Sequence, residues 1–326
     1  MKKIIFMGTP QFSTAILSML VDSGYQVLAV VTQPDKPVGR KKVLTPSPVK
    51  VLALDYDIPV YQPEKLSGSK ELEELMALDA DLIVTAAYGQ FLPTKFLEFP
   101  KYGAVNVHAS LLPKYRGGAP IHYAIMNGDK ETGVTIMRMI AKMDAGDILS
   151  QKAIPIEEDD DVASMFDKLS VVGRDLLKET LPRLFAGQLQ PIAQDPNLVT
   201  FSPNIQREEE QIDWSLSAQE VDYFVRGLRP WPSAHTVFEG IRYKLWQVKP
   251  LPQGNKSDLP IGSFYLDANN RLLVVCGNQS LLQILEIQPA GKGRLTDKEF
   301  TNGFKNLLQQ KVVFDIPNRK VSDNNG

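Results

Sequence analysis

The first part of the chain alternates short β-rich runs with amphipathic helical segments, and this alternation restricts the possible folds more than any other feature. Apolar runs suited to buried strands occupy residues 3–7, 27–31 and 81–85. Residues 14–21 and 71–78 lie between them and repeat apolar side chains at helical spacing. Strand, helix and strand in repetition predict right-handed βαβ units, and therefore an α/β domain built on a parallel sheet.

The character of the sequence changes after residue 187. Residues 188–207 mix prolines with polar side chains, which indicates a linker. Short β-rich runs separated by Pro, Gly and Asn follow, and they favour a small antiparallel barrel or sandwich over another βαβ unit. These runs cover residues 243–248, 261–265, 271–275 and 281–287. A chain of 326 residues is long enough for two domains, which we place at 1–187 and 208–320.

Three segments within the first domain depart from simple alternation. Residues 33–48 contain four prolines and a basic cluster, and we expect a long loop there, of the kind that tends to be functional or disordered. The β-rich runs 134–139 and 148–154 are separated by a turn signal and predict a hairpin. Residues 161–185 repeat apolar side chains at spacings of three and four, which predicts a long amphipathic helix.

Composition excludes several classes of protein. The chain has 36 Lys and Arg against 38 Asp and Glu, so any nucleic-acid partner requires a local basic patch. The single cysteine, Cys276, excludes an internal disulfide and is expected to be a buried hydrophobe. Three histidines and one cysteine give no metal-ligand spacing, and no apolar run approaches the ~18 residues of a membrane span. We therefore expect a soluble, cytosolic protein without a metal.

The glycine that ends the first β-rich run invites comparison with dinucleotide-binding sites. Such sites need the pattern G-x-G-x-x-G, whose glycines let the backbone approach a pyrophosphate. Residues 8–13 read Gly-Thr-Pro-Gln-Phe-Ser and supply only one of the three glycines. The second run also ends without an acidic residue. The residues argue against a nicotinamide dinucleotide site.

The most informative segment is Asn106-Val107-His108, at the end of a further β-rich run over residues 104–107. Side chains two apart on a strand point to one side, and ligands of open α/β sheets lie beyond the carboxyl ends of the strands. An amide donor beside an imidazole can hold a developing oxyanion and move a proton. The alternative is a polar pair that only caps the strand, and geometry alone leaves both interpretations open.

Further segments carry a family resemblance. Residues 116–120, Arg-Gly-Gly-Ala-Pro, form a glycine turn before a helix, and residues 143–147 read Met-Asp-Ala-Gly-Asp. With Asn106 and His108, this arrangement resembles the folate-dependent formyltransferases over nearly the whole chain. The resemblance implies a Rossmann-like parallel-sheet domain followed by a barrel of the oligonucleotide-binding (OB) type. It assigns catalysis to Asn106, His108 and Asp144, and the folate-contacting loop to Ser110, Leu111, Leu112 and Pro113.

The resemblance extends to the family members that act on a charged tRNA, through residues 5–12, 32–37, 212–215 and 229–232. It implies that 10-formyltetrahydrofolate donates a formyl group to the amino group of methionyl initiator tRNA, for translation initiation. It also implies that the barrel binds tRNA and that the basic loop reaches its end. Arg40 falls at the family's basic position, with Lys41 and Lys42 beside it. A monomer with no metal, membrane or protein partner is expected.

Several alternatives stay open. The acceptor could be a small amine, such as a nucleotide sugar or glycinamide ribonucleotide, although neither a second domain nor a basic loop would then be needed. A non-enzymatic RNA-binding protein would not need Asn106, His108 and Asp144 together. The basic loop could be an ordinary solvated loop. His122 and His235 are expected to be structural or surface residues. Core packing is expected for Trp214, Trp231 and Trp246, rather than stacking on bases.

Overall fold

The computed structural model describes residues 1–39, 41–309 and 312–317, and the chain divides into two compact units. Unit 1 comprises residues 1–121, 131–156 and 164–204. Unit 2 comprises residues 122–130 and 157–163 together with the chain from residue 205 onward. Each unit therefore contains segments that are distant in sequence.

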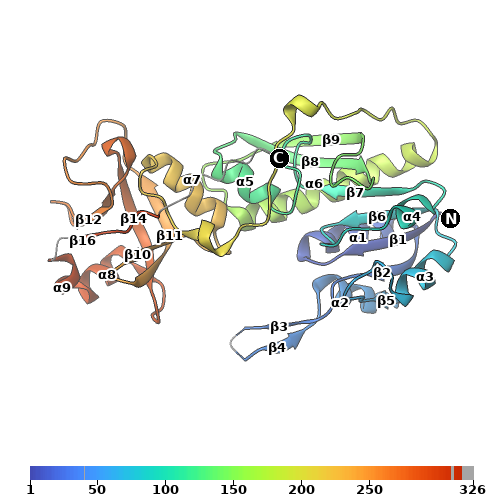
Figure 1. The fold of residues 1–326 in the computed structure, drawn as a ribbon, viewed down its shortest axis with the longest axis horizontal. Coiled ribbons are helices and arrows are strands. Elements are labelled where there is room, and N and C mark those ends of the chain that lie inside the picture. Colours follow the sequence, from blue (N-terminus) through green and yellow to red (C-terminus); the bar gives the residue numbers. More distant parts are fainter. Residues whose placement is uncertain (40, 310–311, 318–326) are drawn as a thin grey trace. The chain divides into compact units, whose positions relative to one another are not determined.

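Unit 1 is built on one sheet whose strands follow the order β5-β2-β1-β6-β7-β8-β9 (Figure 1). The strands from β5 to β7 are parallel, β8 is antiparallel to β7, and β9 is antiparallel to β8. The bounds are β1 Lys3–Gly8, β2 Gln26–Val31, β5 Val60–Tyr61, β6 Leu82–Ala86, β7 Ala104–His108, β8 Glu131–Arg138 and β9 Ile148–Pro155. The predicted parallel sheet and the predicted hairpin are confirmed.

Helices cover both faces of this sheet, because alternate residues of each buried strand face opposite sides. Ile5 and Met7 of β1 pack in one core cluster with Leu72 of α3 and Phe96 of α4. On α6, Ser170 donates a hydrogen bond to the backbone oxygen of α1 residue Phe12. The helices are α1 Gln11–Asp22, α2 Pro48–Asp55, α3 Lys70–Ala77, α4 Thr94–Glu98, α5 Pro120–Met126 and α6 Val162–Phe185, the last two shared between the units.

The segment 33–48 forms a hairpin rather than the expected loop. Strands β3 (Lys36–Val38) and β4 (Val43–Thr45) pair antiparallel and project from the sheet of unit 1 (Figure 1). All residues of both strands are exposed, so the burial pattern that marks other strands in the sequence is missing here. Beyond the hairpin, Ser47 caps α2 by accepting a hydrogen bond from the backbone of Lys50 at 3.1 Å.

Residues 188–204, part of the expected linker, lie along unit 1. Ile192 exchanges backbone hydrogen bonds of 2.8 and 2.9 Å with Ile148 at the start of β9. Phe201 pairs in parallel with Arg116, and a short 3-10 helix, η1, covers Pro196–Leu198. This segment therefore adds backbone pairing beside the predicted site residues.

Unit 2 is an antiparallel, nearly closed barrel with the strand order β10-β11-β14-β13-β12-β16, to which β15 adds beside β14. Its strands are β10 His235–Phe238, β11 Ile241–Pro250, β12 Ser263–Leu266, β13 Leu272–Val275, β14 Leu281–Pro289, β15 Leu295–Thr296 and β16 Val312–Val313. Its helices are α7 Ala218–Leu228, α8 Asp297–Gly303 and α9 Lys305–Leu308, with 3-10 turns η2 Arg207–Glu210 and η3 Gly277–Gln279. The predicted small barrel is confirmed.

Aromatic side chains fill the barrel. Trp214 is fully buried, stacks on Phe314 with ring centroids 5.7 Å apart, and donates a 2.9 Å hydrogen bond to Thr236. Trp246 is also buried, as predicted, but Trp231 is 45% exposed, so core packing was the wrong prediction for that residue. Cys276 is a buried residue of the core, and burial raises the pKa of its thiol to about 12. Within the described residues, no helix combines the length and the apolar character needed to cross a membrane.

Candidate active site

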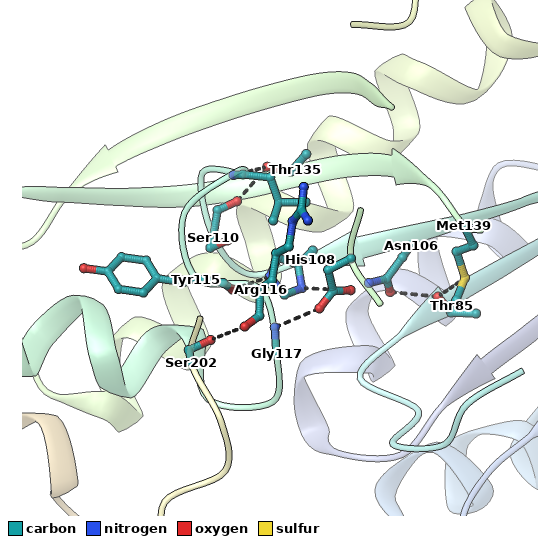
Figure 2. A network of polar contacts seen from close by, with 12 residues as sticks. Thr85, Asn106, His108, Ser110, Tyr115, Arg116, Gly117, Thr135, Met139 and Ser202 are labelled. Carbon is teal, nitrogen blue, oxygen red and sulfur yellow. Dashed lines mark hydrogen bonds and ion pairs between the residues drawn. The ribbon is translucent and has the colours of Figure 1, made fainter. Parts of the chain in front are cut away.

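Asn106 and His108 lie at the carboxyl end of β7, on the same side of the strand. In the neighbouring strand β6, Thr85 is the register partner of Asn106 and donates a 2.7 Å hydrogen bond to its Oδ1. That bond, drawn as a dashed line in Figure 2, occupies the acceptor end of the amide and fixes the orientation of its NH2 group. Asn106 therefore presents a fixed hydrogen-bond donor at the end of the sheet.

The imidazole of His108 is 6% exposed and its two nitrogens have different partners. Nε2 lies 2.9 Å from the backbone oxygen of Tyr115, which can only accept a hydrogen bond. Nε2 is thereby assigned the ring hydrogen, and in the neutral ring Nδ1 carries the lone pair. Nδ1 faces Oδ1 of Asp144 at 3.8 Å (Figure 2). The nitrogen available for proton transfer is therefore the one beside the carboxylate.

Asp144 reaches His108 from the turn between β8 and β9. Its backbone has φ +48°, in the left-handed region that aspartate and asparagine tolerate better than most residues. Its Oδ2 accepts a 2.9 Å hydrogen bond from the backbone N–H of Gly117. A Cβ on Gly146 would lie 2.0 Å from the backbone oxygen of Arg138, so the tight turn requires glycine there. The fold thus brings together Asp144 and His108, which are distant in sequence.

Gly117 also depends on its lack of a side chain. Its φ is +125°, and a Cβ would lie 2.6 Å from the backbone oxygen of Ser202. Ser202 in turn donates its backbone N–H to the oxygen of Arg116 at 2.8 Å. The 115–117 segment therefore packs closely against residues 200–202, and it contacts both members of the His108–Asp144 pair.

The segment from Ser110 to Pro113 is fixed by two polar side chains of β8 and β9. Thr135 donates to the backbone oxygen of Ser110 at 2.7 Å and accepts from the backbone N–H of Leu112 at 3.1 Å. Gln151 donates to the Leu112 oxygen at 2.7 Å. Ser110 and Leu112 are buried, whereas Leu111 and Pro113 are half-buried. Sequence analysis assigned no role to Thr135 or Gln151, because their role depends on contacts across the sheet.

The predicted basic residues lie elsewhere in unit 1. Lys41 and Lys42 are exposed in the turn of the β3–β4 hairpin, and Arg40 lies outside the described residues. At the base of the hairpin, Asp35 pairs with Lys50 at 2.7 Å and accepts a 2.7 Å hydrogen bond from Gln62. The structure therefore separates the predicted site residues into a group around His108 and a hairpin.

The other two histidines belong to unit 2 and are buried there. Burial lowers the pKa of His122 to about 4, although a backbone hydrogen bond with Trp231 acts in the opposite direction. Burial, followed by the charge of Arg242, lowers the pKa of His235 to about 4. Both rings are neutral near pH 7, which fits the predicted structural role. In the described part of the chain, no group of three or more His, Cys, Asp or Glu could hold a metal ion.

An amide donor, an imidazole whose Nδ1 can accept a proton and a carboxylate form a set suited to acyl transfer. The amide can stabilise negative charge on a carbonyl oxygen, and the imidazole can accept a proton from an attacking group. The carboxylate favours the positive ring that results. No nucleophilic side chain is needed in this chemistry.

Comparison with known proteins agrees with this chemistry. The sequence matches the formyl transferase family over residues 1–181 and the formyl transferase C-terminal domain over residues 204–305. The methionyl-tRNA formyltransferase of Enterococcus faecalis is 57% identical over 315 residues, which cover 97% of this chain and 100% of the relative. That of Pediococcus pentosaceus is 58% identical over 317 residues, covering 97% and 98%.

A solved structure shares the fold. The N-formyltransferase from Helicobacter canadensis, in complex with folinic acid and dTDP-3-aminofucose, matches 87% of this chain and 99% of its own with a TM-score of 0.66 and 18% identity. At that identity the likeness concerns the fold alone. The two domain matches and the relatives of high identity over nearly their full length go further, and this chain belongs to the formyltransferase family of enzymes.

Proposed function

We propose that this enzyme transfers the formyl group of 10-formyltetrahydrofolate to the amino group of methionyl initiator tRNA, giving N-formylmethionyl-tRNA for translation initiation in the cytoplasm. The observation that carries the proposal is the identity of 57% to a methionyl-tRNA formyltransferase over its whole length. The side chains of Asn106, His108 and Asp144, which meet at the end of β7, supply the chemistry that such a transfer requires. Each group proposed to react lies within unit 1, so a single copy of the chain suffices.

Asn106 is proposed to stabilise the oxygen of the formyl group as it gains negative charge. Thr85 occupies Oδ1 at 2.7 Å, and the amide nitrogen is therefore already oriented before the reaction begins. Removal of one such donor typically costs about 10²–10³ in turnover. The fixed orientation is important because a donor that must rotate into place loses part of this advantage.

His108 is proposed to take the proton that the attacking amine loses and to pass it to N10 of tetrahydrofolate as the bond between N10 and the formyl carbon breaks. The Tyr115 carbonyl holds Nε2 at 2.9 Å, and Nδ1 remains to accept the proton. Asp144, 3.8 Å from Nδ1, would then stabilise the positive ring. A general base of this kind typically contributes about 10²–10⁴ to the rate.

The folate donor is proposed to lie along the 110–113 segment. Thr135 and Gln151 hold the backbone of this segment, and the buried side chains of Ser110 and Leu112 face the protein. The half-buried side chains of Leu111 and Pro113 are therefore the contacts that this segment offers to the donor. A backbone that is held in place by hydrogen bonds suits a ligand that must present its formyl group at a fixed position.

The acceptor tRNA is proposed to contact the β3–β4 hairpin through Arg40, Lys41 and Lys42, and unit 2 through a basic surface on the barrel. On that surface, the Arg294 guanidinium carbon lies 3.5 Å from the centroid of the Trp246 ring, and Lys244 Nζ lies 5.5 Å from it. Cationic side chains held in this way can contact phosphates without first becoming ordered. A small amine acceptor would need neither surface.

A formylation assay with three acceptors tests the proposal. We expect product with charged initiator tRNA and 10-formyltetrahydrofolate, and none with free methionine or with a nucleotide-linked amino sugar. Preferential formylation of the amino sugar would assign the enzyme to a small acceptor. Binding of tRNA without formyl transfer would support an RNA-binding protein instead.

A further inference from the structure

Gln194 uses the full hydrogen-bonding capacity of its side chain within unit 1. Its Oε1 accepts from Nε and Nη2 of Arg116 at 3.0 and 2.7 Å. Its Nε2 donates to the backbone oxygens of Asp144 and Gly146, both at 2.8 Å. An amide has two acceptor and two donor sites, and all four are occupied here. The same pattern fixes which end of the amide is oxygen.

These four bonds join the two segments that hold the His108–Asp144 pair. The 115–117 segment contacts His108 through the Tyr115 oxygen and Asp144 through the Gly117 N–H. Gln194 binds this segment through the Arg116 side chain and binds the Asp144 turn through its backbone. The Asp144 turn is thereby attached to the 115–117 segment twice, once by Asp144 itself and once by Gln194.

We infer that Gln194 is a positioning residue that sets the Asp144 carboxylate relative to Nδ1 of His108. This inference rests on the proposed roles of His108 and Asp144. Gln194 comes from the segment after α6, which otherwise contributes backbone pairing to this end of the sheet. It does not touch the reacting groups, and it acts by preventing the strained turn at Asp144 from moving. Displacements of about 1 Å in such groups can cost about 10²-fold in rate.

The chemistry of the position favours a neutral amide over a carboxylate. Arg116 is 6% exposed, and a glutamate at position 194 could pair with it strongly. The second glutamate oxygen would, however, face the Asp144 and Gly146 oxygens, which cannot donate. It would also add a negative charge beside Asp144. Glutamine is therefore the residue that satisfies both neighbours without changing the charge of the site.

A double-mutant cycle tests the inference. Gln194→Met keeps the size of the side chain and removes all four hydrogen bonds. With methionyl initiator tRNA and 10-formyltetrahydrofolate, we expect kcat to fall about 10- to 100-fold and both KM values to stay within about twofold. In an Asp144→Ala background, Gln194→Met should change kcat less than twofold, because the group that it positions is gone. Gln190→Ala, an exposed glutamine of the same segment, should leave kcat unchanged.

Melting temperatures and a second variant cover the case in which Gln194→Met folds poorly. Gln194→Glu keeps the Arg116 pairing and so favours folding, but it loses both donors to the Asp144 turn. It should melt close to the wild type and still have reduced kcat. Full kcat in a folded Gln194→Glu enzyme, or an equal loss from Gln194→Met in both backgrounds, would overturn the inference. Full kcat in Asp144→Ala alone would overturn the proposed role of Asp144 and the inference with it.

Discussion

Unit 1 contains two regions of proposed function that are built in opposite ways. Around His108, each of the three polar side chains is hydrogen-bonded to a residue outside its own strand or turn, and the imidazole is buried. In the β3–β4 hairpin, every strand residue is exposed, and the strands contact chiefly each other. The first region is determined by contacts between several segments of unit 1, whereas the described part of the second is an exposed hairpin that projects from the sheet (Figure 1).

This difference follows from what each region is proposed to do. Stabilising a transition state requires donors and bases that are in place before the reaction. A large, flexible acceptor is bound first by exposed charge, which acts over longer distances and tolerates movement. Changes near His108 should therefore alter turnover, and changes in the hairpin should alter the use of the acceptor. Measurements on single variants can test this division.

The largest effect is expected from Asn106→Ala. Turnover should fall by about 10²–10³, while both KM values stay nearly constant, because the amide acts on charge that exists only in the transition state. Thr85→Val, which removes the hydroxyl that orients the amide, should give a smaller fall. Steady-state kinetics decide the point. Full turnover in Asn106→Ala would remove the amide from the reaction.

Asp144→Asn should lower turnover by about 10² with little change in melting temperature. Asparagine tolerates the left-handed backbone of this position, and its oxygen can still accept from Gly117. Only the negative charge beside Nδ1 is removed. If both turnover and melting are unchanged, Asp144 merely stabilises the turn, and the site around His108 needs another partner.

A variant of the β3–β4 hairpin tests whether this region acts on the use of the acceptor and not on turnover. Replacing Lys41 and Lys42 by alanine should raise the KM for tRNA several-fold and leave kcat and the affinity for a folate analogue unchanged. The dependence of log affinity on log salt should become shallower by about 1 for each phosphate that a lysine no longer neutralises. Lys65→Ala, an exposed lysine outside the hairpin, is the matched control. Calorimetry showing an equal fall in folate affinity would mean that the hairpin shapes the donor site.

The sheet and the Asn106–His108 pair could be predicted from the sequence because both depend on local pattern. A buried strand is recognised by its apolar run, and two polar residues at its end must share one side. Asp144 lies 36 positions from His108 and was assigned to the site only through the family resemblance, since no local pattern brings the two residues together. Sequence analysis assigned no role to Thr135, Gln151 or Gln194, because their roles depend on hydrogen bonds between distant segments.

The hairpin and Trp231 were wrongly predicted for a related reason. Sequence patterns detect strands through the contrast between buried and exposed sides, and the β3–β4 strands have no buried side. Core packing is the common fate of tryptophan, but nothing local distinguishes the exposed Trp231 from the buried Trp214. Exposed elements of this kind leave little trace in the periodicity of the chain.

The smallest expected effect is on the pH dependence of stability, and it extends the comparison to unit 2. His122 and His235 are buried there with pKa values of about 4, against about 6.5 in an unfolded chain. Between these values the unfolded state binds protons that the folded state does not, so stability is complete above pH 6.5 and is lost as the pH falls toward 4.

The loss should be about 1–2 kcal/mol for each histidine at pH 5, which lowers the melting temperature by a few degrees. In His122→Gln, the difference in melting temperature between pH 7.5 and pH 5 should shrink, because one of the two groups no longer titrates. Asn106→Ala keeps both histidines, and its melting temperature should show the full pH dependence. An unchanged difference in both His122→Gln and His235→Gln would mean that other groups control acid stability. The result separates two uses of the same side chain: in unit 2, burial keeps both imidazoles neutral near pH 7, whereas His108 is proposed to become charged beside the Asp144 carboxylate during the reaction.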